Sequence, residues 1–427
     1  MMKPLFIKNG RVIDPAKKID AVMNVIVENG KIAALSSVKK MPDGSEIIDA
    51  KGAIVAPGFV DLHCHLRDPG EEYKEDIESG SNAAAAGGFT TICCMPNTKP
   101  VNDSAAVTEY ILKRAQEVSC VTILPVGSIS RDLKGEGLAD IGDLAKAGVV
   151  ALSDDGRPVM NAMLMRHAME YASSFGLFVI SHAEDLNLRG RGVMHEGTVS
   201  TELGLRGIPS AAEESMIARD ILLCGLTGTH LHIAHVSTAG GVEMVRQAKK
   251  LKLPVTCEVT PHHLTLTEHA IHGYDPNTKV NPPLRSETDR KELITGLADG
   301  TIDAVATDHA PHDITEKERG FEESSFGMIG FETALPLCLK LVHDKKITMK
   351  RMTEAMTSRP AQILSLKKKG SFATGNEADI VIFNPNEPVT IRASALKSKS
   401  RNTPFDGWHL RGKVLYTIVG GNIVFKA

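Results

Sequence analysis

Short apolar runs recur through the middle of the chain and alternate with segments of a different periodicity. The segments between the runs place apolar residues near positions i, i+3, i+4 and i+7, which is the spacing of an amphipathic helix. Continuous apolar strands that alternate with such helices predict parallel strands covered by helices on both faces. Eight runs can be counted, the number of strands in a (β/α)8 TIM-type barrel. They start at Gly58, Phe89, Val121, Gly148, Leu177, Leu231, Val255 and Ile302.

The competing architecture is an open, doubly wound sheet. Its dinucleotide-binding form carries a Gly-x-Gly-x-x-Gly turn after the first strand, and no such turn follows the run that begins at Gly58. We therefore expect an α/β barrel over residues 58–364. Ser104 and Ser210 stand where the N-caps of two of its helices are expected.

The two ends of the chain carry a different pattern, in which β-favouring residues flank short turns. Asn9-Gly10 and Asn29-Gly30 are pairs typical of type I′ hairpin turns, and Gly420-Gly421-Asn422 repeats the signal near the other end. Chain termini often lie close together in a fold. We therefore predict that residues 1–57 and 365–427 together form one small β-sandwich domain.

Composition then narrows the class of protein. Of the 427 residues, 42% are hydrophobic and 24% charged, which is ordinary for a globular protein. The net charge is −3, whereas binding of nucleic acid through its phosphates needs a basic surplus. The apolar runs are far shorter than the roughly 20 residues that cross a bilayer. Seven cysteines at no zinc-finger spacing predict reduced thiols. We expect a cytoplasmic protein with neither a nucleic-acid nor a membrane partner.

Side chains that bind metals collect where the predicted strands end. Because the carboxyl ends of barrel strands open onto one face, where active sites of this fold lie, these side chains should meet there. His63 and His65 are two residues apart on one strand and therefore project to the same side. Imidazole and carboxylate suit Zn²⁺, with Mn²⁺, Co²⁺ or Fe²⁺ as alternatives. The other candidate ligands are Asp154, Asp155, His182, His235 and Asp308.

Each of these residues has a simpler interpretation when it is taken alone. A lone His-x-His is more often surface or core, and Asp154-Asp155-Gly156 is typical of a turn. Their convergence on one rim is what predicts a metal site. Two metal ions about 3.5–4 Å apart need a bridging anion, which either aspartate could supply. His262-His263 ends the seventh run and is interpreted as a supporting pair.

Three segments together resemble a known family. They are His63-Cys64-His65-Leu66-Arg67, Met95-Pro96-Asn97 and Asp308-His309-Ala310-Pro311-His312, and Asn281-Pro282-Pro283-Leu284-Arg285 fits with them. These motifs resemble the amidohydrolase superfamily and, more narrowly, the long bacterial (class I) dihydroorotases. The resemblance implies a zinc-dependent cyclic amide hydrolase that interconverts N-carbamoyl-L-aspartate and (S)-dihydroorotate in pyrimidine biosynthesis.

The resemblance also implies roles for individual residues. His63, His65 and Asp308 would hold one Zn²⁺ and His182 and His235 a second, with Asp155 and a hydroxide bridging the two. Asp308 would in addition be the catalytic base and acid. The substrate-binding residues that it implies are His65, Arg67, Asn97, Asn281, His312, Phe326 and Gly327.

Arg67 also has an argument of its own. A guanidinium two residues beyond a metal-binding histidine is placed to pair with a substrate carboxylate. The simpler alternative is a surface salt bridge with Asp68 or Glu71. The polar segment from Asp313 to Gly330 follows the last predicted strand directly and is a candidate lid over the site.

Other functions remain as alternatives. Many members of the superfamily bridge their metals with a carboxylated lysine from strand four, where this chain has Asp154-Asp155-Gly156. That departure counts against a hydantoinase or dihydropyrimidinase. Allantoinase or hydantoinase-type activity, or a non-catalytic partner subunit of the same fold, are the alternatives. The expected partners are a small substrate with a carboxylate, further copies of the chain in a homo-oligomer and, as in some relatives, aspartate carbamoyltransferase.

Overall fold

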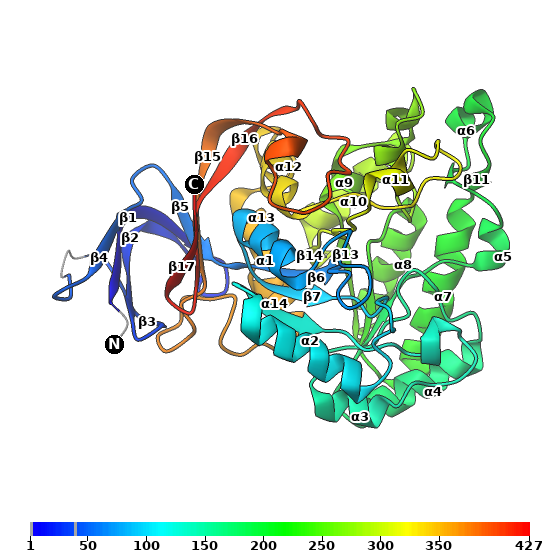
Figure 1. Cartoon of the computed structure of the whole chain (residues 1–427), viewed down its shortest axis with the longest axis horizontal. Helices are drawn as coiled ribbons and strands as arrows, with labels where there is room; N and C mark the ends of the chain where they lie inside the picture. The colour runs from blue at the N-terminus through cyan, green and yellow to red at the C-terminus, as the bar shows by residue number, and fades with distance from the viewer. Residues whose placement is uncertain (1–2, 38–40) are drawn as a thin grey trace.

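The computed structural model of the chain describes residues 3–37 and 41–427, and its centre is a ring of short parallel strands (Figure 1). One arc of the ring consists of β6 (Phe59–Cys64), β7 (Phe89–Cys94) and β8 (Thr122–Pro125). The other arc consists of β9 (Val179–Ser181), β12 (Leu231–Ile233), β13 (Val255–Val259) and β14 (Ala304–Val305). Every pair of neighbouring strands within the two arcs is parallel.

Isolated parallel bridges join the two arcs into a closed ring. Leu152 pairs with Gly127, just after β8, and with Val179 at the start of β9. On the other side, Cys64 pairs with His309. The run that begins at Gly148 is thus reduced to a single bridge residue, Leu152. The fold is the expected (β/α)8 barrel with its fourth strand almost lost.

Helices follow the strands and cover the outside of the barrel (Figure 1). The longer ones are α1 (Ile77–Ala86), α2 (Ala105–Val118), α3 (Ile141–Ala147), α4 (Ala162–Ser173), α7 (Ser210–Thr227), α8 (Ala239–Lys250), α10 (Glu287–Asp299), α12 (Phe331–His343), α13 (Met349–Met356) and α14 (Ser358–Ile363). The loops after the strands carry α5 (Leu186–Arg189), α6 (Thr198–Leu203), α9 (Pro261–Thr265), α11 (Ile314–Lys317) and the two-residue strands β10 (Met194–His195) and β11 (Gly207–Ile208). No helix within residues 3–37 and 41–427 is both long and apolar enough to cross a membrane.

The two expected N-caps turn out differently. Ser104 does occupy the N-cap position of α2, although its side chain makes no capping hydrogen bond. Ser210 is the first residue of α7 itself, and Pro209 takes the N-cap position. The prediction for Ser210 is therefore wrong by one residue, because the extended backbone that precedes the helix is that of Pro209, with φ of −66° and ψ of 149°.

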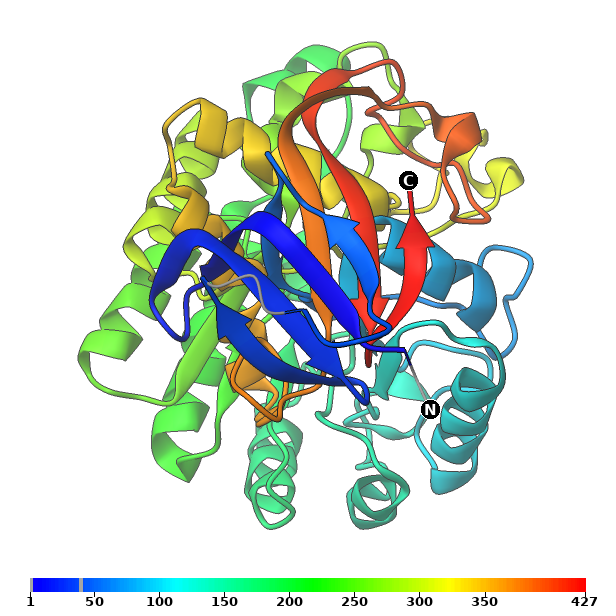
Figure 2. The same cartoon turned by 90° about the vertical axis from the view of Figure 1, so that its left-hand side faces the viewer.

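Both ends of the chain contribute to one eight-stranded sheet, which stands in front of the barrel in Figure 2. Its strands are β1 (Leu5–Asp14), β2 (Ile19–Glu28), β3 (Lys31–Ser36), β4 (Glu46–Asp49), β5 (Ile54–Pro57), β15 (Ile380–Thr390), β16 (His409–Val419) and β17 (Asn422–Lys426). The order is β17-β16-β15-β5-β1-β2-β3, with β4 also paired to β1. The N-terminal strand β5 and the C-terminal strand β15 are direct antiparallel partners. Side chains such as Ile7, Val55 and Ile382 form a separate core beside this sheet.

Two of the three predicted hairpin turns are confirmed. Asn29-Gly30 joins β2 to β3 with φ of 51° and 75°, and Gly420-Gly421 joins β16 to β17 with φ of 53° and 82°, as a type I′ turn requires.

The third prediction, a hairpin at Asn9-Gly10, is wrong. Both residues lie inside β1, where the register with β2 shifts between Ile7 and Gly10 and Asn9 has φ of 63°. The pair therefore forms a β-bulge, which uses the same left-handed backbone as a turn. Gly10 is also packed closely, because a Cβ there would lie 2.4 Å from Cγ2 of Val55.

Aromatic rings connect the sheet to the barrel. Phe383 of β15 lies 6.0 Å from Phe59 at the start of β6, measured between ring centroids. Phe59 in turn lies 5.7 Å from Phe89, which lies 5.6 Å from Phe331 of α12. All four side chains are buried. The junction is at the amino ends of β6 and β7, which leaves the opposite, carboxyl ends free for a functional site.

Replacing Phe383 by Ala should therefore loosen this junction. Loss of a buried phenylalanine costs about 3–5 kcal/mol of unfolding free energy, which urea denaturation followed by circular dichroism would measure. As the control, Val22→Ala on β2 removes a side chain that is 69% exposed and should cost less than about 1 kcal/mol. Equal effects of the two substitutions would contradict the proposed importance of the junction.

Candidate active site

Four histidines and two aspartates meet at the carboxyl ends of the barrel strands. β6 supplies His63 and the residue after its end, His65, while the other four follow the Leu152 bridge, β9, β12 and β14 in turn. These four are Asp155, His182, His235 and Asp308. All six side chains are buried. The barrel thus brings together the residues that the sequence suggested as ligands, from segments far apart along the chain.

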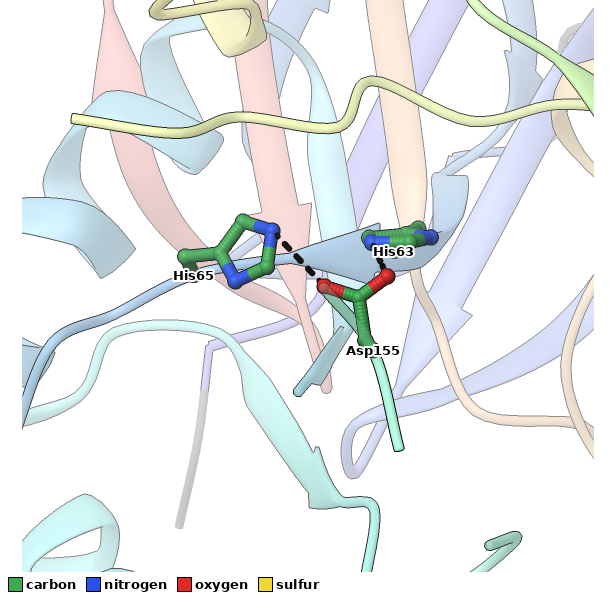
Figure 3. A group of neighbouring side chains, drawn as sticks. All are labelled: His63, His65 and Asp155. Carbon is green, nitrogen blue, oxygen red and sulfur yellow. Dashed lines mark ion pairs between the residues drawn. The ribbon is translucent and has the colours of Figure 1, made fainter. Parts of the chain in front are cut away.

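In the first group, His63 and His65 both face the carboxylate of Asp155 (Figure 3), and the carboxylate of Asp308 lies beside them. His63 Nε2 lies 3.3 Å from Asp155 Oδ1 and 3.6 Å from Asp308 Oδ1. His65 Nε2 lies 3.6 Å from Asp155 Oδ2 and 3.1 Å from Asp308 Oδ1. Two imidazole nitrogens and two carboxylates therefore face one small volume.

The second group shares Asp155 with the first. His182 Nδ1 and His235 Nε2 lie 3.4 Å and 3.6 Å from Asp155 Oδ1, and 2.9 Å from each other. Asp154 does not point into either group, because its Oδ1 accepts hydrogen bonds from the backbone N–H groups of Ile129 and Ser130 at 2.7 Å and 3.0 Å. Of the two adjacent aspartates, Asp155 is the one that lies between both sets of histidines.

The donor atoms suit metal ions better than they suit one another. Buried polar atoms almost always have a hydrogen-bond partner, yet His63 Nε2 and Asp155 Oδ1 have none although both are buried. Two groups of three side chains, His63, His65 and Asp155, and Asp155, His182 and His235, each place their ligand atoms within 4.8 Å of one another. Imidazole nitrogen with carboxylate oxygen is a donor set that binds transition metals. The cluster is of the kind that holds a metal cofactor.

Neighbouring charges keep the two carboxyl groups ionised. Burial alone would raise the pKa of Asp155, but the contacts with His63, His182 and His235 hold that pKa well below its usual range. Burial opposes the ionised form of Asp308 in the same way, and contacts with His65 and His63 lower its pKa despite this. A carboxylate must be deprotonated to bind a metal. Both groups therefore meet that requirement at neutral pH.

Three residues that face the site have a left-handed backbone. The φ angles of Arg67, His235 and Asp308 are 61°, 32° and 46°. Such a conformation costs a non-glycine residue of order 1–3 kcal/mol and persists where the surroundings over-determine it, often at functional sites. One such constraint is next to Asp308, where the carbonyl of His309 accepts a 2.9 Å hydrogen bond from the backbone N–H of His65.

A pocket of about 200 Å³ opens beside the two groups. Its lining includes the substrate-binding residues that the sequence suggested, together with Gly156, Arg189 and Ala310, which were not suggested as site residues. The former are His65, Arg67, Asn97, Asn281, His312, Phe326 and Gly327. Metal-type ligands and the suggested substrate contacts therefore share one cavity.

Arg67 is buried, at 8% exposure, and directed inward. Its Nε donates to the carbonyl of Pro311 at 3.2 Å, and its Nη2 donates to His312 Nε2 at 3.3 Å. The alternative of a salt bridge with Glu71 is not formed, because Glu71 pairs with Lys74 and Lys99. Among the residues that the structure describes, no carboxylate forms an ion pair with Arg67. Its positive charge is thus available to a ligand.

Two amides complete the polar lining of the pocket. Asn97 Oδ1 accepts from His65 Nδ1 at 2.9 Å, which orients that ring. Asn281 Nδ2 donates to Glu184 Oε2 at 3.2 Å, while Asn281 Oδ1 is buried without a partner. Asn281 therefore presents a free acceptor.

The backbone of Gly327 is already engaged by the protein. Its N–H donates to the carbonyl of Lys279 at 2.8 Å, and its carbonyl accepts from Lys317 Nζ and Asn402 Nδ2 at 3.0 Å and 3.1 Å. Glycine is required there, because φ is 132° and a Cβ would lie 2.7 Å from Cβ of Ala310. A ligand can therefore approach Gly327 closely but cannot hydrogen-bond to it without displacing a protein partner.

Two buried lysines hold the segment from Asp313 to Gly330 against the pocket. Lys317 Nζ donates to the carbonyl of Ser325 at 2.7 Å, and Lys279 Nζ donates to the carbonyls of Glu322 and Ser324, both at 2.8 Å. Whether this segment opens as a lid stays a prediction. In the structure these hydrogen bonds hold the segment in place, with Phe326 and Gly327 in the lining of the pocket.

Several residues around the site were not anticipated from the sequence. Glu258 lies behind His63, with its Oε1 3.2 Å from His63 Nδ1. A signal was present, because it is the single charged residue of β13, Val255–Val259. Glu184, which orients Asn281, stands two residues after His182. Arg189 carried no signal, since arginine at the end of a short loop helix is common on any surface.

The adjacent pair His262-His263 lies behind the site. His263 Nε2 hydrogen-bonds to the carbonyl of Pro282 at 3.0 Å and its Nδ1 to Thr260 Oγ1 at 2.7 Å. Neither histidine is among the lining residues of the pocket. A role in supporting the loop that carries Asn281 agrees with these contacts.

Comparisons with known proteins agree with this geometry. Residues 52–240 match the dihydro-orotase-like family, and residues 340–425 match the amidohydrolase family. Dihydroorotases from Syntrophus aciditrophicus and Geobacter metallireducens are each 53% identical to this chain, over 423 and 422 residues, covering 99% of both chains in each case.

Among solved structures, an L-hydantoinase (dihydropyrimidinase) from Arthrobacter aurescens superposes with a TM-score of 0.89 at 27% identity. The match covers 100% of this chain and 96% of that one. The fold is thus shared with hydantoinases, whereas the sequence is far more similar to dihydroorotases. The chain belongs to the dihydroorotase family of the amidohydrolases.

Proposed function

We propose that the chain is a metal-dependent hydrolase of a cyclic amide, which interconverts N-carbamoyl-L-aspartate and (S)-dihydroorotate in pyrimidine biosynthesis. The observation that carries this proposal is one pocket that holds both a cluster of metal-binding type and the buried, unpaired cation Arg67. The cluster suits hydrolysis of an amide, and the cation suits a substrate that carries a carboxylate. The dihydroorotases that share half of its residues support the same assignment.

The proposed metal is Zn²⁺, with one or two ions in each chain. His63, His65 and Asp308 would hold one ion and His182 and His235 the other, while Asp155, which faces both groups, would be shared. Bound Zn²⁺ supplies a Lewis acid that polarises the amide carbonyl and lowers the pKa of water to about 7.

Asp308 is the proposed catalytic base and acid. Its carboxylate, ionised at neutral pH, lines the pocket and can accept a proton from the attacking water. The water oxygen forms a bond to the amide carbon, the ring C–N bond breaks, and Asp308 returns the proton to the departing nitrogen. The second proton of the water is released to solvent from the new carboxyl group, so the products are a free carboxylate and a ureido group. The same steps in reverse close the ring.

Arg67 is proposed to bind the carboxylate that the substrate keeps throughout the reaction. Burial lowers the pKa of His312 to about 4, so its imidazole is neutral at physiological pH. His312 Nδ1 donates to Glu316 Oε2 at 2.9 Å, which leaves Nε2 as an acceptor for Arg67. His312 would therefore orient the guanidinium, whose remaining N–H groups could form a bidentate pair with the carboxylate.

A hydantoinase-type hydrolase is the second candidate, because the barrel superposes closely on an L-hydantoinase. A hydantoinase-type hydrolase and a dihydroorotase differ in the charge of their substrates. An uncharged cyclic amide would leave the buried guanidinium of Arg67 without an anionic partner, at a cost in binding. The pocket therefore favours the acidic substrate.

Substitutions at Asp155 and Asp154 should differ in their effect on zinc binding. Asp155→Ala should lower the zinc content measured by atomic emission, because it removes the carboxylate that faces both groups of histidines. Asp154→Asn is the matched control and should keep the zinc content of the unmodified chain, since Asp154 binds backbone N–H groups instead. Full zinc content in Asp155→Ala would contradict the proposal that both groups of histidines share Asp155 as a metal ligand.

The second prediction concerns Asp308. Asp308→Asn should slow turnover of dihydroorotate and of carbamoyl-aspartate by about 10²–10⁴-fold, the usual contribution of general acid–base catalysis. Absorbance assays in both directions would measure it. Zinc content determined on the same samples separates loss of the base from loss of a ligand, and normal turnover in either direction would exclude the assigned role.

The third prediction tests the carboxylate site. Arg67→Met should raise KM for dihydroorotate by about 10–100-fold, because hydrogen bonds to a charged group contribute roughly 1.5–3 kcal/mol. Arg67→Lys keeps the positive charge but lacks the planar guanidinium, so its KM for dihydroorotate should lie between those of the unmodified chain and Arg67→Met. If the unmodified chain hydrolysed uncharged dihydrouracil faster than dihydroorotate, the hydantoinase-type alternative would be preferred.

A further inference from the structure

We propose that Glu258 is a positioning residue, which fixes the ring of His63 so that Nε2 faces the metal site. The inference rests on the proposed metal site, although not on the identity of the substrate. Glu258 is the fourth of the five residues of β13, is 0% exposed and lies 3.2 Å from both His63 Nδ1 and His232 Nε2. It is therefore a carboxyl group held between two histidines in the interior of the barrel.

The alternation of side chains along β13 directs Glu258 into the barrel. Cys257 and Val259, its neighbours in the strand, belong to the same hydrophobic cluster as the inner faces of the surrounding helices. Successive side chains of a strand point to opposite sides. Glu258 consequently lies inside the ring, as does Thr256 two residues earlier.

The contacts of Glu258 form a short polar chain. Its Oε1 lies 3.2 Å from His63 Nδ1, and its Oε2 lies 3.2 Å from His232 Nε2. His232 Nδ1 lies 2.8 Å from Thr256 Oγ1. The chain thus runs from the candidate metal ligand His63 down the inside of the barrel, away from the pocket.

The hydrogen bond to Glu258 determines which nitrogen of His63 carries the proton. A neutral imidazole has one donor and one acceptor nitrogen. A carboxylate can only accept, so Nδ1 must be the donor, and the lone pair is left on Nε2. That atom is the one that lies 3.3 Å from Asp155 and 3.6 Å from Asp308. Partners of this kind orient ligand rings and increase their basicity.

Packing alone does not account for a carboxylate at this position. Burying an ionised carboxyl group is costly unless it is paired and hydrogen-bonded. The two close partners of Glu258 are both histidines, His63 and His232, whereas several other inward positions of the ring are apolar, as at Leu62, Ile180 and Ala304. An apolar side chain would fill the same space without that cost. The contribution of Glu258 therefore lies in its effect on His63.

The test measures zinc affinity of the full chain by competition with a chromophoric chelator. In Glu258→Ala one zinc-binding step should weaken by about 10–100-fold, the usual effect of losing such a partner. Glu258→Gln keeps the volume and an amide oxygen that can accept from Nδ1–H, but a neutral acceptor is weaker than a charged one. This variant should therefore lose about 3–10-fold.

Asp379→Asn is the matched control, because it neutralises a buried carboxylate just before β15 of the terminal sheet, where Asp379 pairs with Lys369 and accepts from the N–H of Gly420. It should leave both zinc-binding steps unchanged, and circular dichroism of every variant would monitor folding. Wild-type affinity in either Glu258 variant, or an equal loss in Asp379→Asn, would overturn the inference. Failure of the unmodified chain to hydrolyse dihydroorotate while it binds zinc would contradict the proposed function and leave this inference standing.

Discussion

The parallel pairing of Cys64 with His309 joins the first barrel strand to the last, and the rest of the candidate site depends on it. The bridge places the residues after β6 beside the residues after β14, so that His65 and Asp308 come within 3.1 Å although 243 positions separate them. A hydrogen bond from the N–H of His65 to the carbonyl of His309 reinforces this closure. Without it, half of the ligand atoms would lie on a different edge of an open sheet.

Closure also concentrates charged groups of opposite sign among buried side chains. Asp155 and Asp308 remain ionised because histidines surround them, whereas Arg67 is buried close by without a carboxylate of its own. Under the proposed function, the anions would bind a metal and the cation a substrate. This separation within one pocket of about 200 Å³ is what distinguishes the site from a buried salt-bridge network.

Much of this arrangement could be predicted from sequence, because hydrophobic periodicity and strand-end position are local signals. The barrel, the terminal sheet and the convergence of the metal-type ligands follow from those signals alone. Periodicity and position left the choice between Asp154 and Asp155 open, and only the family resemblance favoured Asp155, because the direction of each side chain depends on the distant N–H groups of Ile129 and Ser130. The pair Asn9-Gly10 likewise favours a left-handed backbone, but a hairpin turn and a β-bulge both use that conformation, so the sequence does not distinguish between them. The role of Glu258 depends on a contact with His63 across 195 positions.

The pairing of β5 with β15 has a consequence for synthesis of the chain. Val55 of β5 and Ile382 of β15 are direct partners. The edge of β5 that pairs with β15 therefore has no neighbour until the ribosome has added more than 300 further residues. At roughly 5–20 residues per second this takes about 15–60 s. During that interval β1 to β5 expose an unpaired strand edge of the kind that promotes association between chains. Completion of the terminal sheet is therefore one of the last events of biosynthesis, and nascent chains on neighbouring ribosomes are the partners that could interfere with it.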